Sequence, residues 1–178
     1  MTYYGGRHLA DAFRTVRKNT IVIAQDIPED KYNFRPAPNT RTVSELLIHI
    51  ALMPSWQQEV HGERVPSLDG YDFSGRFAKD KAEEAIPRTK AQIRDMLQRS
   101  ADGFASFLEG LSEGVLAEMV AMPGGAPPKS RFEMLLSVKE HEMHHRAQLM
   151  LIERHLGIVP HLTRERETRF ARPAQQPA

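Results

Sequence analysis

The sequence His-Glu-Met-His-His-Arg-Ala-Gln occupies residues 141–148, inside a long segment of periodic apolar residues near the C-terminus. The periodicity predicts a helix over residues 130–156. At about 3.6 residues per turn, His141 and His145 then lie one turn apart on the same helix face. Apolar residues recur on that face at the alternating spacing of three and four that is typical of a helix-bundle seam. The two imidazoles are therefore expected to point into the core, where they can bind one metal ion.

A third histidine occupies an inward position in another predicted helix. Thr-Val-Ser-Glu at residues 42–45 matches a capping box, which predicts that a helix begins there. Apolar residues then recur every three or four positions as far as Val60, and they place His49 in the middle of the apolar seam. Pro54 follows one turn later and removes an amide donor, so we expect a kink beside His49.

Four amphipathic segments are present, and none shows the alternation of a strand. They predict helices at residues 7–25, 42–60, 87–110 and 130–156. The expected fold class is therefore all-α, a four-helix bundle with long inter-helix connections. The connections are too long for simple hairpins, which indicates crossovers or covering loops. Residues 62–86 are predicted to form such a loop, with its aromatic residues packed over one end of the bundle.

Composition limits the class of protein. The chain has 178 residues and is expected to form one domain over residues 1–162, followed by a charged and Pro/Gln-rich tail, 163–178, that is mobile or an arm on a neighbouring subunit. A formal net charge of +1 gives no basic footprint for nucleic acid. No run approaches the roughly 18 apolar residues of a membrane span. We expect a cytoplasmic protein that binds a small-molecule substrate, without a nucleic-acid or membrane partner.

The chain contains no cysteine. Disulfides, thiolate metal ligands and a cysteine nucleophile are thereby excluded, and any sulfur chemistry must use a thiol from outside. If the second and last predicted helices are neighbours, His49 faces His141 and His145 and a three-nitrogen site results. Three protein ligands leave a coordination position open, as in catalytic sites, and zinc, nickel and iron all accept imidazole. The alternative is that these are ordinary core histidines; three inward positions favour the metal.

Several neighbours of the histidines have more than one interpretation. His144 is expected behind the ligands, at an interface or simply exposed. Glu45 and Gln148 either orient an imidazole or serve as a helix cap and a bundle contact, respectively. Glu142 and Arg146 face solvent or pair with neighbouring helices. The other histidines are expected on the surface: His8, His61, His155 and His161. Five arginines form either an anion-binding rim or a solvated face: Arg35, Arg41, Arg164, Arg166 and Arg169.

The sequence resembles the DinB/YfiT-like superfamily over roughly residues 7–162. The resemblance rests on Val-Ser-Glu-Leu-Leu-Ile-His-Ile-Ala at residues 43–51 and on His-Glu-Met-His-His-Arg-Ala-Gln-Leu at residues 141–149, followed by Leu-Gly-Ile-Val-Pro at residues 156–160. One departure is Ala147, where the family often has glycine, a change that alters helix packing without removing a ligand. The resemblance implies a four-helix bundle and, as in many members, a homodimer.

The resemblance also implies a divalent metal held by His49, His141 and His145. Characterised relatives include thiol-dependent S-transferases and a thiol-dependent maleylpyruvate isomerase, while many members have no known reaction. The leading hypothesis is a metal-dependent transferase that activates an exogenous low-molecular-weight thiol. One alternative is a hydrolase with a metal-bound hydroxide, although no carboxylate has the spacing of a general base. Others are a non-catalytic, stress-associated metal-binding dimer and a plain bundle that binds no metal.

Overall fold

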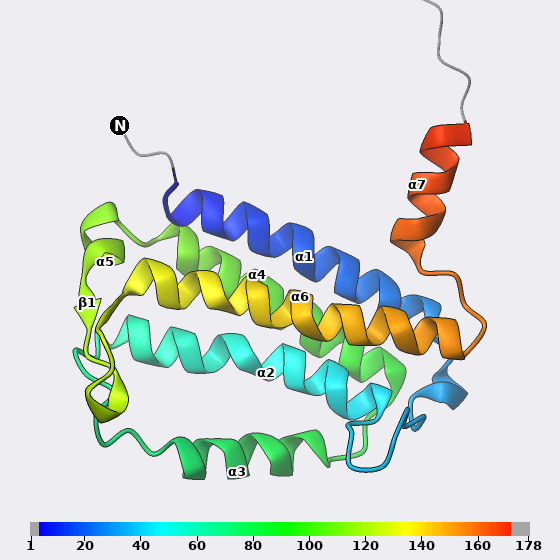
Figure 1. The fold of residues 1–178 in the computed structure, drawn as a ribbon, viewed down its shortest axis with the longest axis horizontal. Helices are drawn as coiled ribbons and strands as arrows, with labels where there is room; N and C mark the ends of the chain where they lie inside the picture. The colour runs from blue at the N-terminus through cyan, green and yellow to red at the C-terminus, as the bar shows by residue number, and fades with distance from the viewer. Residues whose placement is uncertain (1–3, 172–178) are drawn as a thin grey trace, which may run out of the picture.

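The computed structural model describes residues 4–171, and seven α-helices make up most of them. Four helices are long: α1 (Gly6–Asp26), α2 (Val43–Gly62), α4 (Lys90–Glu109) and α6 (Arg131–His155). Both α1 and α2 pack against α4 and against α6, which confirms the predicted all-α four-helix bundle. Figure 1 shows α1 and α6 running in one direction and α2 and α4 in the opposite one. The chain must therefore cross the length of the bundle between α2 and α4.

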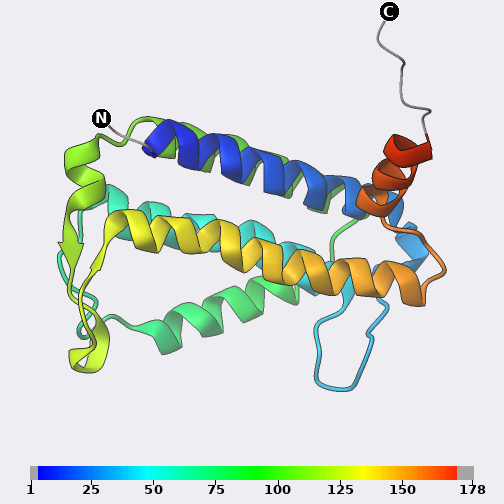
Figure 2. The ribbon, with the colours of Figure 1, turned by 45° about the horizontal axis from the view of Figure 1, so that its top comes forward.

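That crossing is made by a helix that the sequence pattern does not predict. The pattern predicts a loop over residues 62–86, but α3 spans Phe73–Glu84 and lies beside α2 (Figures 1 and 2). Asp72 caps it, because its carboxylate accepts a hydrogen bond of 2.8 Å from the backbone N–H of Gly75. Only one residue of α3 is buried, so the helix has no apolar periodicity of the kind that reveals a bundle helix.

Helix α4 begins later than the sequence indicates. Pro87 is predicted as its first-turn residue, but α4 starts at Lys90. Thr89 is the cap: its hydroxyl accepts the N–H of Gln92, and the Gln92 side chain accepts the N–H of Thr89 at 2.8 Å. This reciprocal capping box satisfies two free backbone donors and outweighs the preference of proline for the first turn.

The connection between α4 and α6 closes one end of the bundle. It contains α5 (Glu113–Ala117), strand β1 (Met119–Val120), a 3-10 turn (Pro123–Gly125) and strand β2 (Lys129–Ser130). The two strands pair antiparallel, with Met119 opposite Ser130. The sequence predicts a turn-rich linker with one short helical turn here and no strand. Strands of two residues are too short for alternation to appear in a sequence.

After α6 the chain continues into α7 (His161–Ala171), which packs against α1. The sequence indicates no regular structure from residue 163 onward; residues 163–171 are helical instead, and residues 172–178 lie outside the described part. Arg164 of α7 bonds to Asp26 of α1 at 2.5 Å. His161, predicted on the surface, is buried at this junction. No helix within residues 4–171 combines the length and apolarity required to cross a membrane.

A buried ion pair joins the four long helices. Nε of Arg17 in α1 donates to both carboxylate oxygens of Glu142 in α6, at 2.9 and 3.0 Å. Nη1 of Arg17 donates to the carbonyl oxygen of Leu97 in α4 at 2.8 Å, and Nη2 to that of Ile50 in α2 at 3.1 Å. Ile50 lies four residues before Pro54, which has no N–H for this carbonyl. Arg17 therefore replaces a missing helix hydrogen bond as well as neutralising Glu142.

Glu153 of α6 is a buried carboxyl with no hydrogen-bond partner among residues 4–171. Burial, reinforced by Asp26, raises its pKa to about 7. An unfolded glutamate has a pKa of about 4.3. Between these two values the folded chain binds more protons than the unfolded chain, so the free energy of unfolding falls as pH rises through this window.

The variant Glu153→Gln is expected to abolish that fall. It should match the wild type near pH 4 and exceed its unfolding free energy at pH 8 by up to roughly 4 kcal/mol, since one pKa unit corresponds to about 1.4 kcal/mol. Urea denaturation of both proteins at several pH values measures the difference. Glu140→Gln, at an exposed position of the same helix, serves as the control and should leave the pH dependence unchanged. A constant difference between Glu153→Gln and wild type across this range would contradict the prediction.

Candidate metal centre

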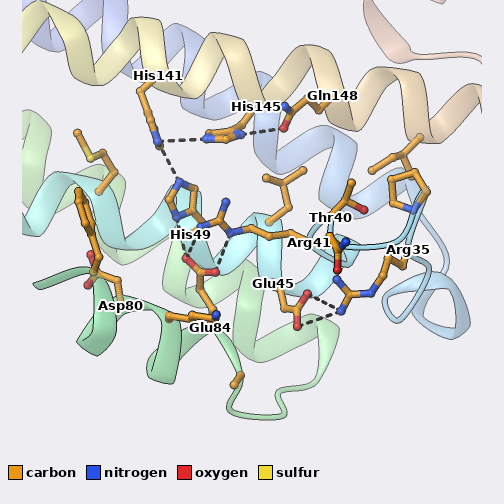
Figure 3. A pocket seen from close by; sticks show the side chains of 18 of the residues that line it. Arg35, Thr40, Arg41, Glu45, His49, Asp80, Glu84, His141, His145 and Gln148 are labelled. Carbon is orange, nitrogen blue, oxygen red and sulfur yellow. Dashed lines mark hydrogen bonds and ion pairs between the residues drawn. The ribbon is translucent and has the colours of Figure 1, made fainter. Parts of the chain in front are cut away.

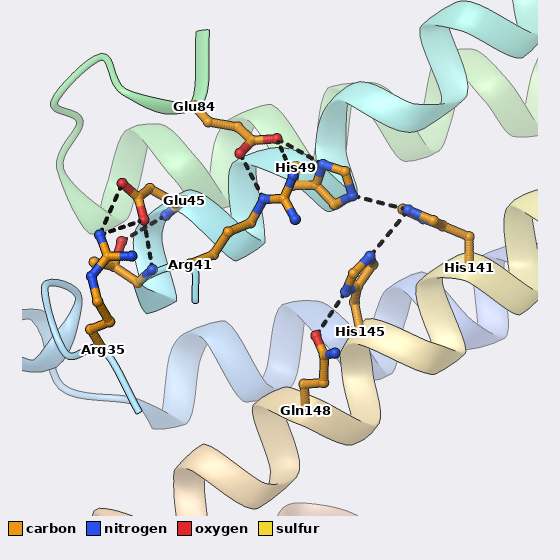
Figure 4. Close-up of polar contacts among 9 residues, drawn as sticks. Arg35, Arg41, Glu45, His49, Glu84, His141, His145 and Gln148 are labelled. Atoms are coloured by element: carbon orange, nitrogen blue, oxygen red, sulfur yellow. Dashed lines mark hydrogen bonds and ion pairs between the residues drawn. The ribbon is translucent and has the colours of Figure 1, made fainter. Parts of the chain in front are cut away.

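The three histidines named from the sequence meet where α2 faces α6. Nε2 of His141 lies 3.0 Å from Nε2 of His49 and 3.1 Å from Nε2 of His145 (Figures 3 and 4). One ring nitrogen from each residue lies within 4.8 Å of the other two. His145 is buried and the other two are half-buried. The predicted pairing of the two helices, with all three imidazoles on facing sides, is thus present in the structure.

Two neighbours fix the orientation of the rings. Nδ1 of His49 lies 2.7 Å from Oε1 of Glu84, and Nδ1 of His145 lies 2.8 Å from Oε1 of Gln148 (Figure 4). Both partners are acceptor oxygens, so the ring hydrogen of each imidazole belongs on Nδ1. The Nε2 lone pairs of His49 and His145 are then both directed at His141.

This arrangement leaves too few protons between the rings. His141 can place at most one hydrogen on Nε2, while Nε2 of His49 and of His145 both require a donor. Its own Nδ1 is buried with no partner among the described residues. Burial, reinforced by the neighbouring histidines, lowers the pKa of His141 to about 3, and burial lowers that of His145 to about 4. Protonation of His141 or His145 near pH 7 therefore does not supply the missing hydrogen.

A divalent cation is the group that such a cluster fits. Neutral imidazoles are its usual nitrogen ligands, and the ion satisfies three converging lone pairs at once. Tetrahedral zinc, with bonds of about 2.0–2.1 Å, separates its ligand nitrogens by roughly 3.3–3.4 Å. The two short separations at His141, 3.0 and 3.1 Å, are close to that value. Nickel and iron accept the same donor set.

Glu84 belongs to the site, although no pattern in the sequence indicates it. It lies at the end of α3 with only 6% of its surface exposed. Its carboxylate bonds to His49 on one side and to Nε of Arg41, at 2.7 Å, on the other. Burial raises the pKa of Glu84, but these two bonds outweigh burial and hold it below its usual value. An ionised carboxylate behind a ligating histidine fixes the ring and makes its free nitrogen a stronger donor.

The structure also decides between the open interpretations near the histidines. Glu45 is a helix cap: it accepts the N–H of Thr42 at 2.7 Å and contacts none of the three candidate ligands. Gln148 orients His145, as described above. His144 is exposed, and its Nε2 lies 3.2 Å from Nε2 of Gln148, which donates to it. Of the two positions predicted for Glu142, facing solvent or pairing with a neighbouring helix, the structure shows the second, because Glu142 pairs with Arg17 of α1.

His61 is a further correction, because the sequence predicts it on the surface and it is buried. It lies 2.8 Å from Oε1 of Gln57 and 3.2 Å from Nη1 of Arg131. Burial and, after it, the Arg131 charge lower the pKa of His61 to about 4. It is a neutral core histidine with both nitrogens bonded. His8 and His155 are exposed as predicted.

The histidine cluster opens into a pocket of about 1150 Å³. Helices α2, α3 and α6 and the connector before α2 all contribute lining residues. Arg35 and Arg41 of that connector line the pocket, whereas the other three arginines proposed for an anion rim lie on α7 and do not. The lining also includes Glu45, Met53, Trp56, Phe73, Arg76, Phe77, Asp80, Lys81 and Glu84.

Three solved structures share this fold. YfiT from Bacillus subtilis, described as a probable metal-dependent hydrolase with an unusual four-helix bundle topology, is 14% identical over 89% of this chain and 91% of its own, with a TM-score of 0.68. The DinB-like protein YjoA from Bacillus subtilis is 20% identical over 84% and 92%, with a TM-score of 0.62. A DinB-like protein from Bacillus cereus is 15% identical over 86% and 93%, with a TM-score of 0.65.

No curated protein matches the chain by sequence. The model of the DinB superfamily does, over residues 12–149. That match runs from α1 into α6 and includes His49, His141 and His145. The chain belongs to the DinB superfamily.

Proposed function

We propose that this chain is a divalent-metal-dependent transferase that joins an exogenous low-molecular-weight thiol to a small electrophile. The observation that carries the proposal is the convergence of three Nε2 atoms at the wall of an open pocket whose carboxylates are all engaged by arginines. His49, His141 and His145 would hold a divalent ion, which would lower the pKa of a coordinated thiol or water.

The pocket carboxylates favour a thiol over water. A general base for hydrolysis must be free to accept a proton near neutral pH. Within residues 4–171, no unpaired carboxylate lines the pocket. The three that do are each bonded to an arginine: Glu45 to Arg35, Asp80 to Arg76, and Glu84 to Arg41. A thiol needs such a base less than water does, because a metal-bound thiol is deprotonated outright while a metal-bound water still has a pKa of about 7.

The described residues then have distinct tasks. Glu84 and Gln148 hold the rings of His49 and His145, so that both free nitrogens face the same point. His49 and Arg41 together lower the pKa of Glu84 and so keep it from taking the thiol proton. The apolar side chains of the pocket exclude water from the attacking sulfur, which protects the thiolate from protonation.

A metal-dependent hydrolase is the second candidate. It is favoured by the similarity of the fold to that of YfiT, the probable metal-dependent hydrolase. At 14% identity this similarity shows the fold alone. The same three histidines serve a hydrolase equally well, so the activity itself has to separate the two candidates.

The test uses the zinc-substituted protein with 2-mercaptoethanol and 1-chloro-2,4-dinitrobenzene, and separately with 4-nitrophenyl acetate and no thiol. We expect enzyme- and metal-dependent formation of the thioether, and its loss in His145→Ala. His155→Ala, an exposed histidine of the same helix, is the matched control and should retain the rate. Ester hydrolysis without thiol transfer would support the second candidate. The absence of both activities in the metal-containing protein would overturn both.

A further inference from the structure

We infer that the pocket has two ends with different specificities, one for the carboxylate of an anionic thiol and one for a planar aromatic electrophile. The histidine cluster lies between them. This inference rests on the proposed thiol transfer and names the substrate classes for it. Three observations carry it: the order of residues along α2, the free donors of two arginines, and an exposed aromatic wall.

Helix α2 sets the two ends apart. Glu45, His49, Met53 and Trp56 all line the pocket from this helix. At a rise of about 1.5 Å per residue, Glu45 lies roughly 6 Å before His49 along the axis, and Trp56 roughly 10 Å beyond it. Figure 3 shows the same division: Glu45 lies on one side of the histidines with the connector arginine Arg35, and Asp80 lies on the other.

The end near Glu45 has unused hydrogen-bond donors. Arg35 bonds to Glu45 through Nη2 alone, at 3.1 and 3.4 Å. Arg41 bonds to Glu84 through Nε and Nη2. The remaining guanidinium N–H groups of both arginines have no hydrogen-bond partner among the described residues. Guanidinium N–H groups donate strong, charge-assisted hydrogen bonds to carboxylates, so these free donors match a carboxylate ligand.

The charge of the pocket as a whole also favours an anion. Arg35, Arg41 and Arg76 are balanced by Glu45, Glu84 and Asp80, respectively. Lys81 of α3 lines the pocket as well and forms no ion pair within residues 4–171. One positive charge is therefore uncompensated, and a divalent ion at the histidines would add to it. An incoming carboxylate therefore meets a net attraction in a partly desolvated pocket.

The far end is aromatic. The ring of Trp56 lies 6.0 Å from that of Phe73, and the ring of Phe73 lies 6.2 Å from that of Phe77, centre to centre. Phe77 lines the pocket yet is 67% exposed. Together the three rings form one continuous aromatic wall of the pocket, and a planar ring stacks on such a wall favourably.

The transfer balances without an oxidant or a second cofactor. The thiolate sulfur forms a bond to the electrophilic carbon while the bond from that carbon to its leaving group breaks. The leaving group departs with the electron pair, and the thiol proton goes to solvent. Seating the thiol by its carboxylate and the electrophile by its ring places the two reacting atoms beside each other at the histidines, which is the benefit of a pocket with two ends.

The experiment compares mercaptosuccinate with the uncharged 2-mercaptoethanol, using 1-chloro-2,4-dinitrobenzene as electrophile and correcting for the uncatalysed rates. We expect the wild type to favour mercaptosuccinate in kcat/KM by about 10-fold or more, because hydrogen bonds to charged groups contribute about 1.5–3 kcal/mol. Arg35→Gln should reduce this preference at least about fivefold through KM. Arg99→Gln is the control, a 74% exposed arginine outside the pocket whose loss should keep the preference.

The aromatic end is tested with the same thiol and a second electrophile, iodoacetamide, which has no ring. Phe77→Ala should lower the preference for 1-chloro-2,4-dinitrobenzene over iodoacetamide. Phe170→Ala, at a 79% exposed phenylalanine on α7, should keep it. If Phe77→Ala shows the same preference between the two electrophiles as the wild type, this half of the inference is contradicted.

The outcomes separate the inference from the proposed function. Turnover of both thiols without preference would overturn the inference and leave thiol transfer standing. If no thiol is turned over, the proposed function fails, and binding decides: thiolate absorption bands of the cobalt-substituted protein report affinity for each thiol. Tighter binding of mercaptosuccinate in the wild type than in Arg35→Gln would support the anion end. Equal affinities would overturn it.

Discussion

Arg17→Met is expected to lower the free energy of unfolding by about 3–5 kcal/mol, which is the usual cost of removing one partner from a buried ion pair. Both side chains of the pair are at most 2% exposed, so the Glu142 carboxyl would be left in the core without its partner. The carbonyl oxygens of Leu97 and Ile50 would lose their donors as well. Ile50 is the more affected of the two, because Pro54 offers it no N–H.

Urea denaturation followed by circular dichroism measures this effect. Arg14→Met is the matched control on the same helix: Arg14 pairs with Glu109 in an exposed position, and its loss should leave the transition midpoint unchanged. The double variant Arg17→Met/Glu142→Leu should recover much of the loss, because no buried charge remains. A double variant as unstable as Arg17→Met would show that the charge of Glu142 is not the cause.

Glu84→Gln is expected to weaken zinc binding about 10–100-fold while leaving the fold intact. A neutral amide still accepts the Nδ1 hydrogen of His49, but it stabilises a positively charged centre less than a carboxylate does. The variant also loses the ion pair with Arg41, which links the end of α3 to the connector before α2. The ring of His49 would then be both less basic and less well oriented.

Competition with a chromogenic chelator measures that affinity directly. Asp80→Asn is the control: Asp80 lies one helical turn before Glu84 on α3, lines the same pocket and pairs with Arg76, and it touches no histidine. It should retain the affinity of the wild type. Equal affinities for Glu84→Gln and Asp80→Asn would show that the carboxylate behind His49 does not tune the site.

The core ion pair and the histidine cluster belong to one arrangement. Glu142 is the residue next to His141, and its bond to Arg17 fixes the rotation of α6 about its own axis. With Glu142 directed at α1, His141 and His145 are directed at α2. We therefore regard the buried charges as the feature that aims the two imidazoles at His49, in addition to any effect on stability.

Much of this arrangement could be predicted from the sequence because it is encoded locally. The capping box that precedes α2 and the apolar spacing around His49 are visible within one helix. The four-residue separation of His141 and His145 likewise fixes a common face without knowledge of the rest of the fold. The prediction that α2 and α6 are neighbours required only the assumption that the four helices form a bundle.

The rest depends on partners that are distant in the sequence. Glu84 lies 35 residues from His49 in a helix with no apolar stripe, so nothing in the local pattern connects the two. Arg17 and Glu142 are charged residues at core positions, so in a pattern of periodic apolar residues they count only as breaks. His61 forms a hydrogen bond with Arg131, which is 70 residues away in the sequence. Without knowledge of that partner, the sequence does not distinguish a buried His61 from an exposed one.

The central claim is that three histidines bind one divalent metal, and elemental analysis of the untagged protein tests it most directly. The wild type and the variant with His49, His141 and His145 all changed to alanine are purified side by side and incubated with zinc, nickel and iron. We predict about one tightly held metal ion per wild-type chain and none in the triple variant. A wild type that retains no metal under any of these conditions would contradict the account.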